Sequence, residues 1–121
     1  MTQKLVIPNW LPPPVLNVSR QRHWAPVSRE IREIVRLVYV SAIEARWKPI
    51  GRDAPRQRLT VVFVFPMRRR RDVDNLYARA KHCVDGIKPF LVDDDSEHLD
   101  LIVKAETVPG VKQTQLTLEP A

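Results

Sequence analysis

Two aspartates separated by a single residue, Asp72 and Asp74, carry the first chemical signal in the chain. In extended chain, side chains two residues apart point to one face, so two carboxylates there repel each other unless a cation lies between them. Carboxylate oxygens suit Mg²⁺ or Mn²⁺, and such an ion beside a phosphodiester polarises a phosphoryl oxygen and activates a water molecule. The spacing therefore predicts a metal site that acts on phosphate; the alternative is a pair of turn aspartates.

A second acidic run supplies further carboxylates at Asp93, Asp94 and Asp95. It precedes a predicted strand, and it would add a third ligand if that strand paired beside the one before Asp72. The alternative is a solvated acidic loop. No histidine pair or cysteine set in the sequence offers the ligands that zinc needs. The only cysteine, Cys83, is expected to be a small buried hydrophobe.

Four consecutive arginines lead directly into the first aspartate: Arg68, Arg69, Arg70 and Arg71. Guanidinium groups at a strand end can hold phosphates through paired hydrogen bonds, whereas a charge run in solvent is the plainer explanation. The adjacent carboxylates favour phosphate contact. Further along, Lys81 lies two helical turns beyond Asp74, where a cation could offset charge that develops on a phosphate. A salt bridge from Lys81 to Asp85 explains the same spacing equally well.

Composition places these residues in one small globular domain that spans residues 1–121. The chain is 44% hydrophobic and 28% charged, with a net charge of +6, and an excess of basic residues favours nucleic acid as a partner. No apolar run approaches the roughly 20 residues of a membrane span, and no signal-peptide pattern is seen. We therefore expect a cytoplasmic protein that does not enter membranes. The histidines His82 and His98 are expected at the surface.

Hydrophobic patterning predicts the elements that position these residues. Strands are predicted at 4–8, 59–65, 99–107 and 112–119, and helices at 28–47 and 76–88. Ser28 and Asn75 are the expected N-caps of the two helices. The last two strands are joined around Pro109 and Gly110, which indicates a hairpin. The order β-α-β-α-β-β predicts an α/β (α+β) fold, with a mixed sheet and two main helices.

These motifs together resemble the RusA-like endodeoxyribonucleases. The family order is a basic residue, then D-x-D-N, then a lysine four residues before D-A/G-L, then D-D before a strand. This chain follows that order with RRRRDVDN, then Lys81 before Asp85 and Gly86, and then the second acidic run. Two features nearer the N-terminus are also similar to the family. One is three consecutive prolines followed by Asn17, and the other is a basic loop that contains Arg20 and Arg22. The resemblance covers about residues 5 to 119.

The resemblance implies roles for particular residues. Asp72 and Asp74 match the metal-binding aspartates of D-x-D-N, and Asp95 best matches the third, with its neighbour Asp94 as the fallback. Lys81 matches the catalytic lysine if a few residues are inserted after Leu76, whereas strict spacing from D-x-D-N places Ala78 there. DNA contacts are expected from residues 68–71 and from Asn17, Arg20 and Arg22.

The activity that the resemblance implies is Mg²⁺-dependent resolution of Holliday junctions by a homodimer that makes paired nicks. Mn²⁺ is the expected substitute for Mg²⁺, since both prefer oxygen ligands. Two alternatives stay open: a nuclease for other branched DNA such as a flap or fork, and a non-catalytic DNA-binding protein of the same fold. A short resolvase of this kind suits a phage or prophage. The apolar faces of 99–107 and 112–119 are the expected dimer interface.

Overall fold

The computed structural model describes residues 1–13, 24–71, 73–93 and 97–121, with the backbone alone at 24–27, 73 and 74. Over this part of the chain, the predicted order of four strands and two helices is confirmed. The elements are β1 (Gln3–Pro8), α1 (Trp24–Glu44), β2 (Gln57–Phe65), α2 (Val73–Ile87), the short 3-10 helix η1 (Lys88–Phe90), β3 (Leu99–Thr107) and β4 (Gln113–Pro120).

The strands form one mixed sheet in the order β1-β4-β2-β3. β2 runs parallel to β3 and antiparallel to β4, so it lies between them, and the predicted hairpin of the last two strands is wrong. The connection instead turns around the end of β2, where the Val108 N–H donates to the Phe65 carbonyl at 3.0 Å. β2 takes this central position because Leu59, Val61 and Phe63 are fully buried.

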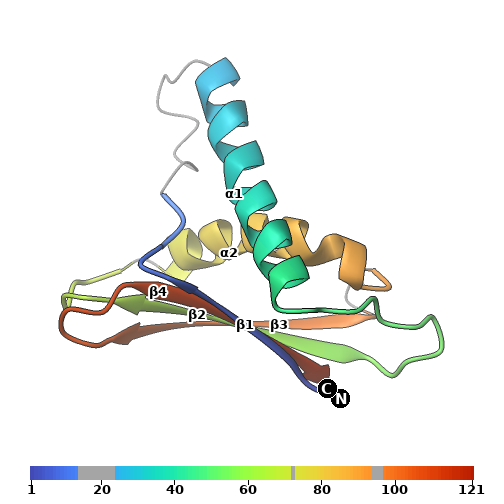
Figure 1. Ribbon diagram of the computed structural model, residues 1–121. Coiled ribbons are helices and arrows are strands. Elements are labelled where there is room, and N and C mark those ends of the chain that lie inside the picture. The colour runs from blue at the N-terminus through green and yellow to red at the C-terminus, as the bar shows by residue number, and fades with distance from the viewer. Residues whose placement is uncertain (14–23, 72, 94–96) are drawn as a thin grey trace.

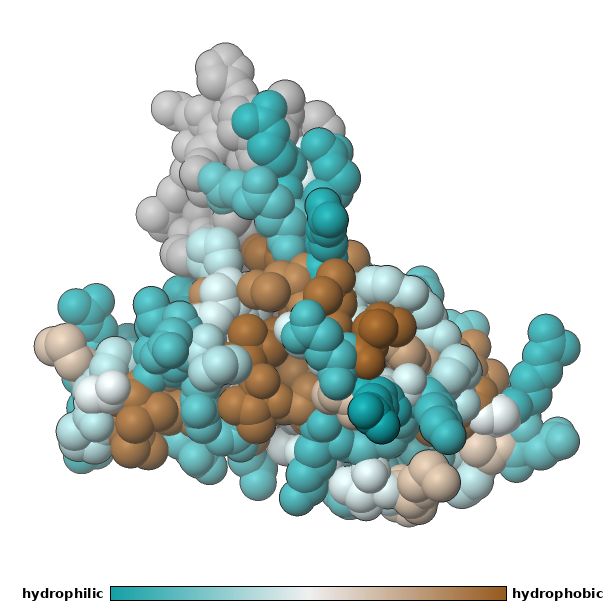
Figure 2. Space-filling view, in the orientation of Figure 1, coloured by the Kyte–Doolittle hydropathy of each residue, from teal (hydrophilic) through white to brown (hydrophobic). Residues whose placement is uncertain are grey.

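Both helices cover the same face of the sheet (Figure 1). α2 lies along this face, whereas α1 rises from it with its N-terminal end farthest from the strands. Hydrophilic residues cover the part of α1 that stands away, and hydrophobic residues gather lower down (Figure 2). Neither helix of the described chain has the length and apolarity that crossing a bilayer requires.

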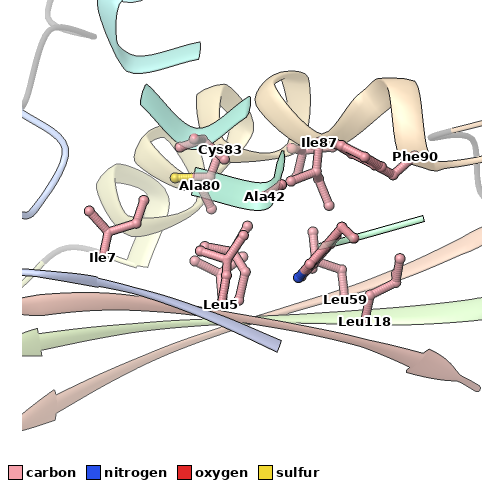
Figure 3. Close-up of a cluster of buried hydrophobic side chains, with 14 of the residues drawn as sticks. Leu5, Ile7, Ala42, Leu59, Ala80, Cys83, Ile87, Phe90 and Leu118 are labelled. Carbon is pink, nitrogen blue, oxygen red and sulfur yellow. The ribbon is translucent and has the colours of Figure 1, made fainter. Parts of the chain in front are cut away.

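The core fills the space between the helices and the sheet (Figure 3). Ala80, Cys83 and Ile87 of α2 are fully buried, as their helical spacing predicts, and they face Leu59 and Leu118 of the strands. Burial raises the pKa of the Cys83 thiol to about 12, so this cysteine is a core side chain rather than a nucleophile.

The first helix begins and ends earlier than its pattern predicts. It begins at Trp24, so Ser28 is not its N-cap, and the Ser28 hydroxyl instead accepts a hydrogen bond from Arg32 at 3.1 Å. It ends at Glu44 because Arg46 adopts a left-handed backbone with φ 62°. The Arg46 and Trp47 N–H groups donate to the Ile43 and Ala42 carbonyls, which closes a Schellman motif and buries Trp47.

The expected dimer interface needs correction for one of its two strands. β4 lies inside the sheet between β1 and β2, and its apolar residues Leu116 and Leu118 are buried in the chain's own core. They cannot also form an interface with a second copy. β3 is an edge strand, and its residues Leu101 and Val103 remain partly exposed.

Candidate nucleic-acid interface

Three residues of the arginine run line a hollow between the end of β2 and the first turns of α2. This hollow, here called the arginine cavity, encloses about 420 Å³. Its described lining combines residues from the strand end, the connecting loop and the helix: Phe65, Pro66, Met67, Arg69, Arg70, Arg71, Asn75, Leu76 and Arg79. A strand end, a loop and a helix start therefore bring four guanidinium groups together.

Arg71 braces the loop that forms one side of the cavity. Its guanidinium carbon lies 3.6 Å from the centre of the Phe65 ring, in a cation–π contact. Nη1 donates to the Arg69 carbonyl at 2.9 Å, and Nη2 donates to the Met67 carbonyl at 3.1 Å. Desolvation, with the nearby charge of Arg69, lowers the pKa of Arg71. Two N–H groups of Arg71 are therefore engaged by the backbone, which holds this side chain against the loop.

Arg79 reaches the cavity from α2. Its Nε is shielded from water and has no hydrogen-bond partner within the described part of the chain. Burial, and after it the charge of Arg71, lowers the pKa of Arg79. A guanidinium group whose charge is disfavoured by burial and by Arg71, with an unused donor of its own, makes a place where an anion is stabilised.

Sequence reasoning did not assign Arg79 to the site. A signal was present, because Arg79 follows Asn75 by four residues and so lies on the same side of a helix. Of the arginines that it did assign, Arg69 and Arg70 line the cavity and are exposed. Arg68 is exposed as well but is not part of the described lining.

Lys81 lies elsewhere on α2. It is mostly exposed, it does not belong to the described cavity lining, and its Nζ lies 3.6 Å from Oδ1 of Asp85. The salt bridge that the spacing allows is therefore present. A catalytic role for Lys81 stays a prediction, and it would require this exposed pair to open.

The acidic residues of the predicted metal site fall mostly outside the described residues. Asp72, Asp94 and Asp95 lie outside the described residues, and so do the predicted DNA contacts Asn17, Arg20 and Arg22. Asp74 and Asn75 both have a helical backbone in the first turn of α2. The prediction that the aspartate pair lies in extended chain is therefore wrong, and so is the prediction that Asn75 is the N-cap. Among the described residues, no three His, Cys, Asp or Glu side chains are grouped to hold a metal.

Asp74 and Asp93, the described aspartates of the two acidic runs, belong to opposite ends of the sheet. α2 starts beside the end of β2, at Phe65, whereas Leu99 of β3 pairs with Gln57 at the start of β2. The nine-residue strand between these ends spans about 26 Å. Asp93 and Glu97, which flank Asp94 and Asp95 in sequence, lead into β3 at its far end (Figure 1). A metal site that used both Asp74 and Asp93 would therefore need two copies of the chain.

His82 is buried, so the expectation of a surface histidine is wrong for this residue. It lies on α2 with its Nδ1 3.9 Å from Oδ2 of Asp85, and neither ring nitrogen has a hydrogen-bond partner among the described residues. Desolvation lowers the pKa of His82, Lys81 lowers it further, and Asp85 offsets part of the change. The folded protein therefore holds this imidazole in its neutral form near neutral pH.

A scan against protein-family models and a search of curated proteins found no match to this chain. What the chain does must therefore be argued from the residues themselves.

Proposed function

We propose that the chain is a metal-dependent endodeoxyribonuclease that binds branched DNA through the arginine cavity. The observation that carries this proposal is the cavity itself: guanidinium groups from the loop directly before the D-x-D-N sequence converge with that of Arg79 from the helix after it. The described lining contains no carboxylate that would neutralise these charges. Phosphodiesters are the anions that such a cluster fits best.

Within the cavity, Arg69, Arg70 and Arg79 are the residues that would contact phosphate. Arg71 positions the two arginines of the loop, because its hydrogen bonds to the Met67 and Arg69 carbonyls fix the loop against Phe65. Paired N–H donors from a guanidinium match two phosphate oxygens, so these residues orient the backbone as well as attract it. A scissile phosphate would then lie beside the first turn of α2, where the helix dipole also favours negative charge.

The described lining supplies donors for an anion and only the Asn75 amide oxygen as a polar side-chain ligand for a cation. Ligands for Mg²⁺ or Mn²⁺ would come from Asp72 and Asp74, next to the arginines in sequence, with Asp95 or Asp94 as a third. Their hard oxygen donors fit these ions. When bound, the ion supplies Lewis-acid activation of water and of the phosphate.

The substrate proposed is a four-way junction, and the active form a homodimer, on the strength of the RusA-like motif order. A two-fold dimer would carry two arginine cavities, which suits paired nicks in opposed strands. The separation of Asp74 from Asp93 also suits a dimer, since a second copy could bring the two acidic runs to one site.

The experiment that tests the proposal incubates the protein with labelled four-way, flap, fork and linear duplex DNA, with Mg²⁺ or with a chelator. We expect Mg²⁺-dependent cuts in the four-way junction and little cutting of the linear duplex. Preferential cutting of flaps or forks would reassign the substrate within the same chemistry. Tight binding with no cutting under any metal would show a non-catalytic DNA-binding protein and contradict the proposed activity.

A further inference from the structure

The arginine cavity has two chemically different walls. Arg69, Arg70 and Arg79 supply positive charge, whereas Pro66, Met67 and Leu76 supply apolar surface. Met67 is 60% exposed although it is a large apolar side chain. Together with the partly buried Pro66 and Leu76, it gives the cavity an apolar wall that a bound ligand could cover.

The size of the hollow indicates more than a phosphate group. Its volume of about 420 Å³ lies within the range of roughly 300–1,000 Å³ that accommodates small organic ligands. A lone phosphate would be held by the guanidinium groups and would leave the apolar wall uncovered. A ligand that carries an anionic group and a flat apolar group side by side would cover both walls.

We propose that the arginine cavity takes one unpaired nucleotide of a DNA strand, with its phosphate at Arg69, Arg70 and Arg79 and its base against Met67 and Leu76. The inference rests on the proposed DNA substrate, and it adds how branched DNA is distinguished from duplex. Bases stack on apolar side chains and on guanidinium planes whatever their sequence, so the cavity requires no particular base.

How easily a base can leave the stack decides the selectivity for branched DNA over duplex DNA. In a continuous duplex each base is paired and stacked, and it enters a protein pocket only after the strand is distorted at a cost in free energy. Nucleotides at a junction crossover, a fork or a flap are more easily unstacked. A cavity that binds the base as well as the phosphate therefore favours branched and single-stranded DNA over duplex.

The test compares two labelled single strands of equal length and equal phosphate number, one with all its bases and one built from abasic sites. Binding is measured by fluorescence anisotropy with a chelator present, so that no cutting occurs. We expect the strand with bases to bind about tenfold more tightly, which is within the range that stacking of one base supplies. Equal affinities for the two strands would overturn the inference.

The variant Met67→Gln tests whether the preference for the strand with bases arises in the cavity. Glutamine keeps the length of methionine and makes the tip of the side chain polar. The exposed position makes this variant safe for folding. We expect it to bind the two strands almost equally, whereas the control Ile43→Gln, half exposed on α1, should keep the wild-type preference. A preference unchanged in Met67→Gln would place base recognition elsewhere and overturn the assignment.

Two further outcomes separate this inference from the proposed activity. Base preference without any cutting of branched DNA would support the nucleotide cavity and contradict the nuclease. Normal cutting with no base preference would contradict the nucleotide cavity alone. Binding of free deoxyadenosine monophosphate as tight as that of the strand would indicate a free-nucleotide site and overturn the inference.

Discussion

Arg79 and Lys81 lie two residues apart on α2 and meet different surroundings. Arg79 lines the arginine cavity with an unused buried donor, whereas Lys81 is exposed and pairs with Asp85. We expect Arg79→Ala to weaken DNA binding about tenfold or more, since hydrogen bonds to charged groups contribute about 1.5–3 kcal/mol. The dependence of log affinity on log salt should become shallower by about 0.9 for one lost phosphate contact.

Lys81→Ala is the matched control for Arg79→Ala. An exposed salt bridge contributes about 0–1 kcal/mol, so this variant should bind DNA and unfold nearly as the wild type does. Anisotropy titrations at several salt concentrations measure both variants. Cutting of a labelled four-way junction is measured on the same variants. If Lys81→Ala binds DNA normally but cuts it at least a hundredfold more slowly, the lysine assignment from the family motif is right. If Arg79→Ala binds DNA as the wild type does, the cavity assignment is wrong.

His82 gives the protein a pH dependence of stability. Because burial lowers its pKa below the usual value of 6.5, the unfolded chain binds a proton at this position more readily than the folded protein does. Stability from this residue is therefore full above about pH 6.5 and is lost as the pH falls through the lowered pKa. Urea unfolding of wild type and His82→Leu, between about pH 7.5 and 5, measures this effect. The wild type should lose more stability than the variant; equal losses would show that His82 does not titrate on unfolding.

At the scale of elements, apolar periodicity predicts which segments are helix or strand and which residues form the core. Ala80, Cys83 and Ile87 are buried as their spacing predicts. Helix ends are predicted less well, because they depend on backbone groups rather than on side-chain pattern. α1 ends where Arg46 turns left-handed, a conformation more usual for glycine. α2 begins inside the D-x-D-N motif, which no apolar spacing indicates.

Gly86 sets how closely the two helices pack. A Cβ at this position would lie 2.6 Å from Cβ of Val38 and 3.0 Å from the Val35 carbonyl oxygen. Overpacking of this kind costs about 1–3 kcal/mol, and the better helix propensity of alanine returns up to about 1 kcal/mol. Gly86→Ala should therefore destabilise the fold by about 1–2 kcal/mol.

Gly51→Ala is the control for that substitution, because an added Cβ there meets no atom within 4 Å. Its stability in urea should stay within about 0.5 kcal/mol of the wild type. A Gly86→Ala variant as stable as Gly51→Ala would mean that α1 and α2 pack less closely than described.

At the scale of the whole molecule, sequence predicts the order of elements along the chain but not the order of strands across the sheet. The segment around Pro109 and Gly110 has the composition of a hairpin turn, yet β2 lies between the strands that it joins. Residue spacing also does not show that β2 and β3 pair in parallel, which puts Asp74 and Asp93 at opposite ends of the sheet. Such features arise from long-range packing, which local pattern does not encode.

This separation predicts complementation between two inactive variants. If Asp74 of one copy and Asp95 of another serve one metal site, each of Asp74→Asn and Asp95→Asn is inactive alone. A mixture that exchanges subunits at random would restore about a quarter of the wild-type sites, because half the dimers are mixed and each contains one intact site. Nicking of a labelled junction measures the recovery. No recovery in a mixture shown by native mass spectrometry to contain mixed dimers would rule out a shared site.

On the proposed function, the segment beside the arginine cavity cuts DNA and does not merely bind it. The most direct measurement follows binding and cleavage of one labelled four-way junction by wild type and Asp74→Asn, with Mg²⁺ present. Losing a carboxylate near phosphate should leave affinity unchanged or tighter, since repulsion is removed, while cleavage is abolished. Cleavage by Asp74→Asn at the wild-type rate, or binding by the wild type with no cleavage, would contradict the account.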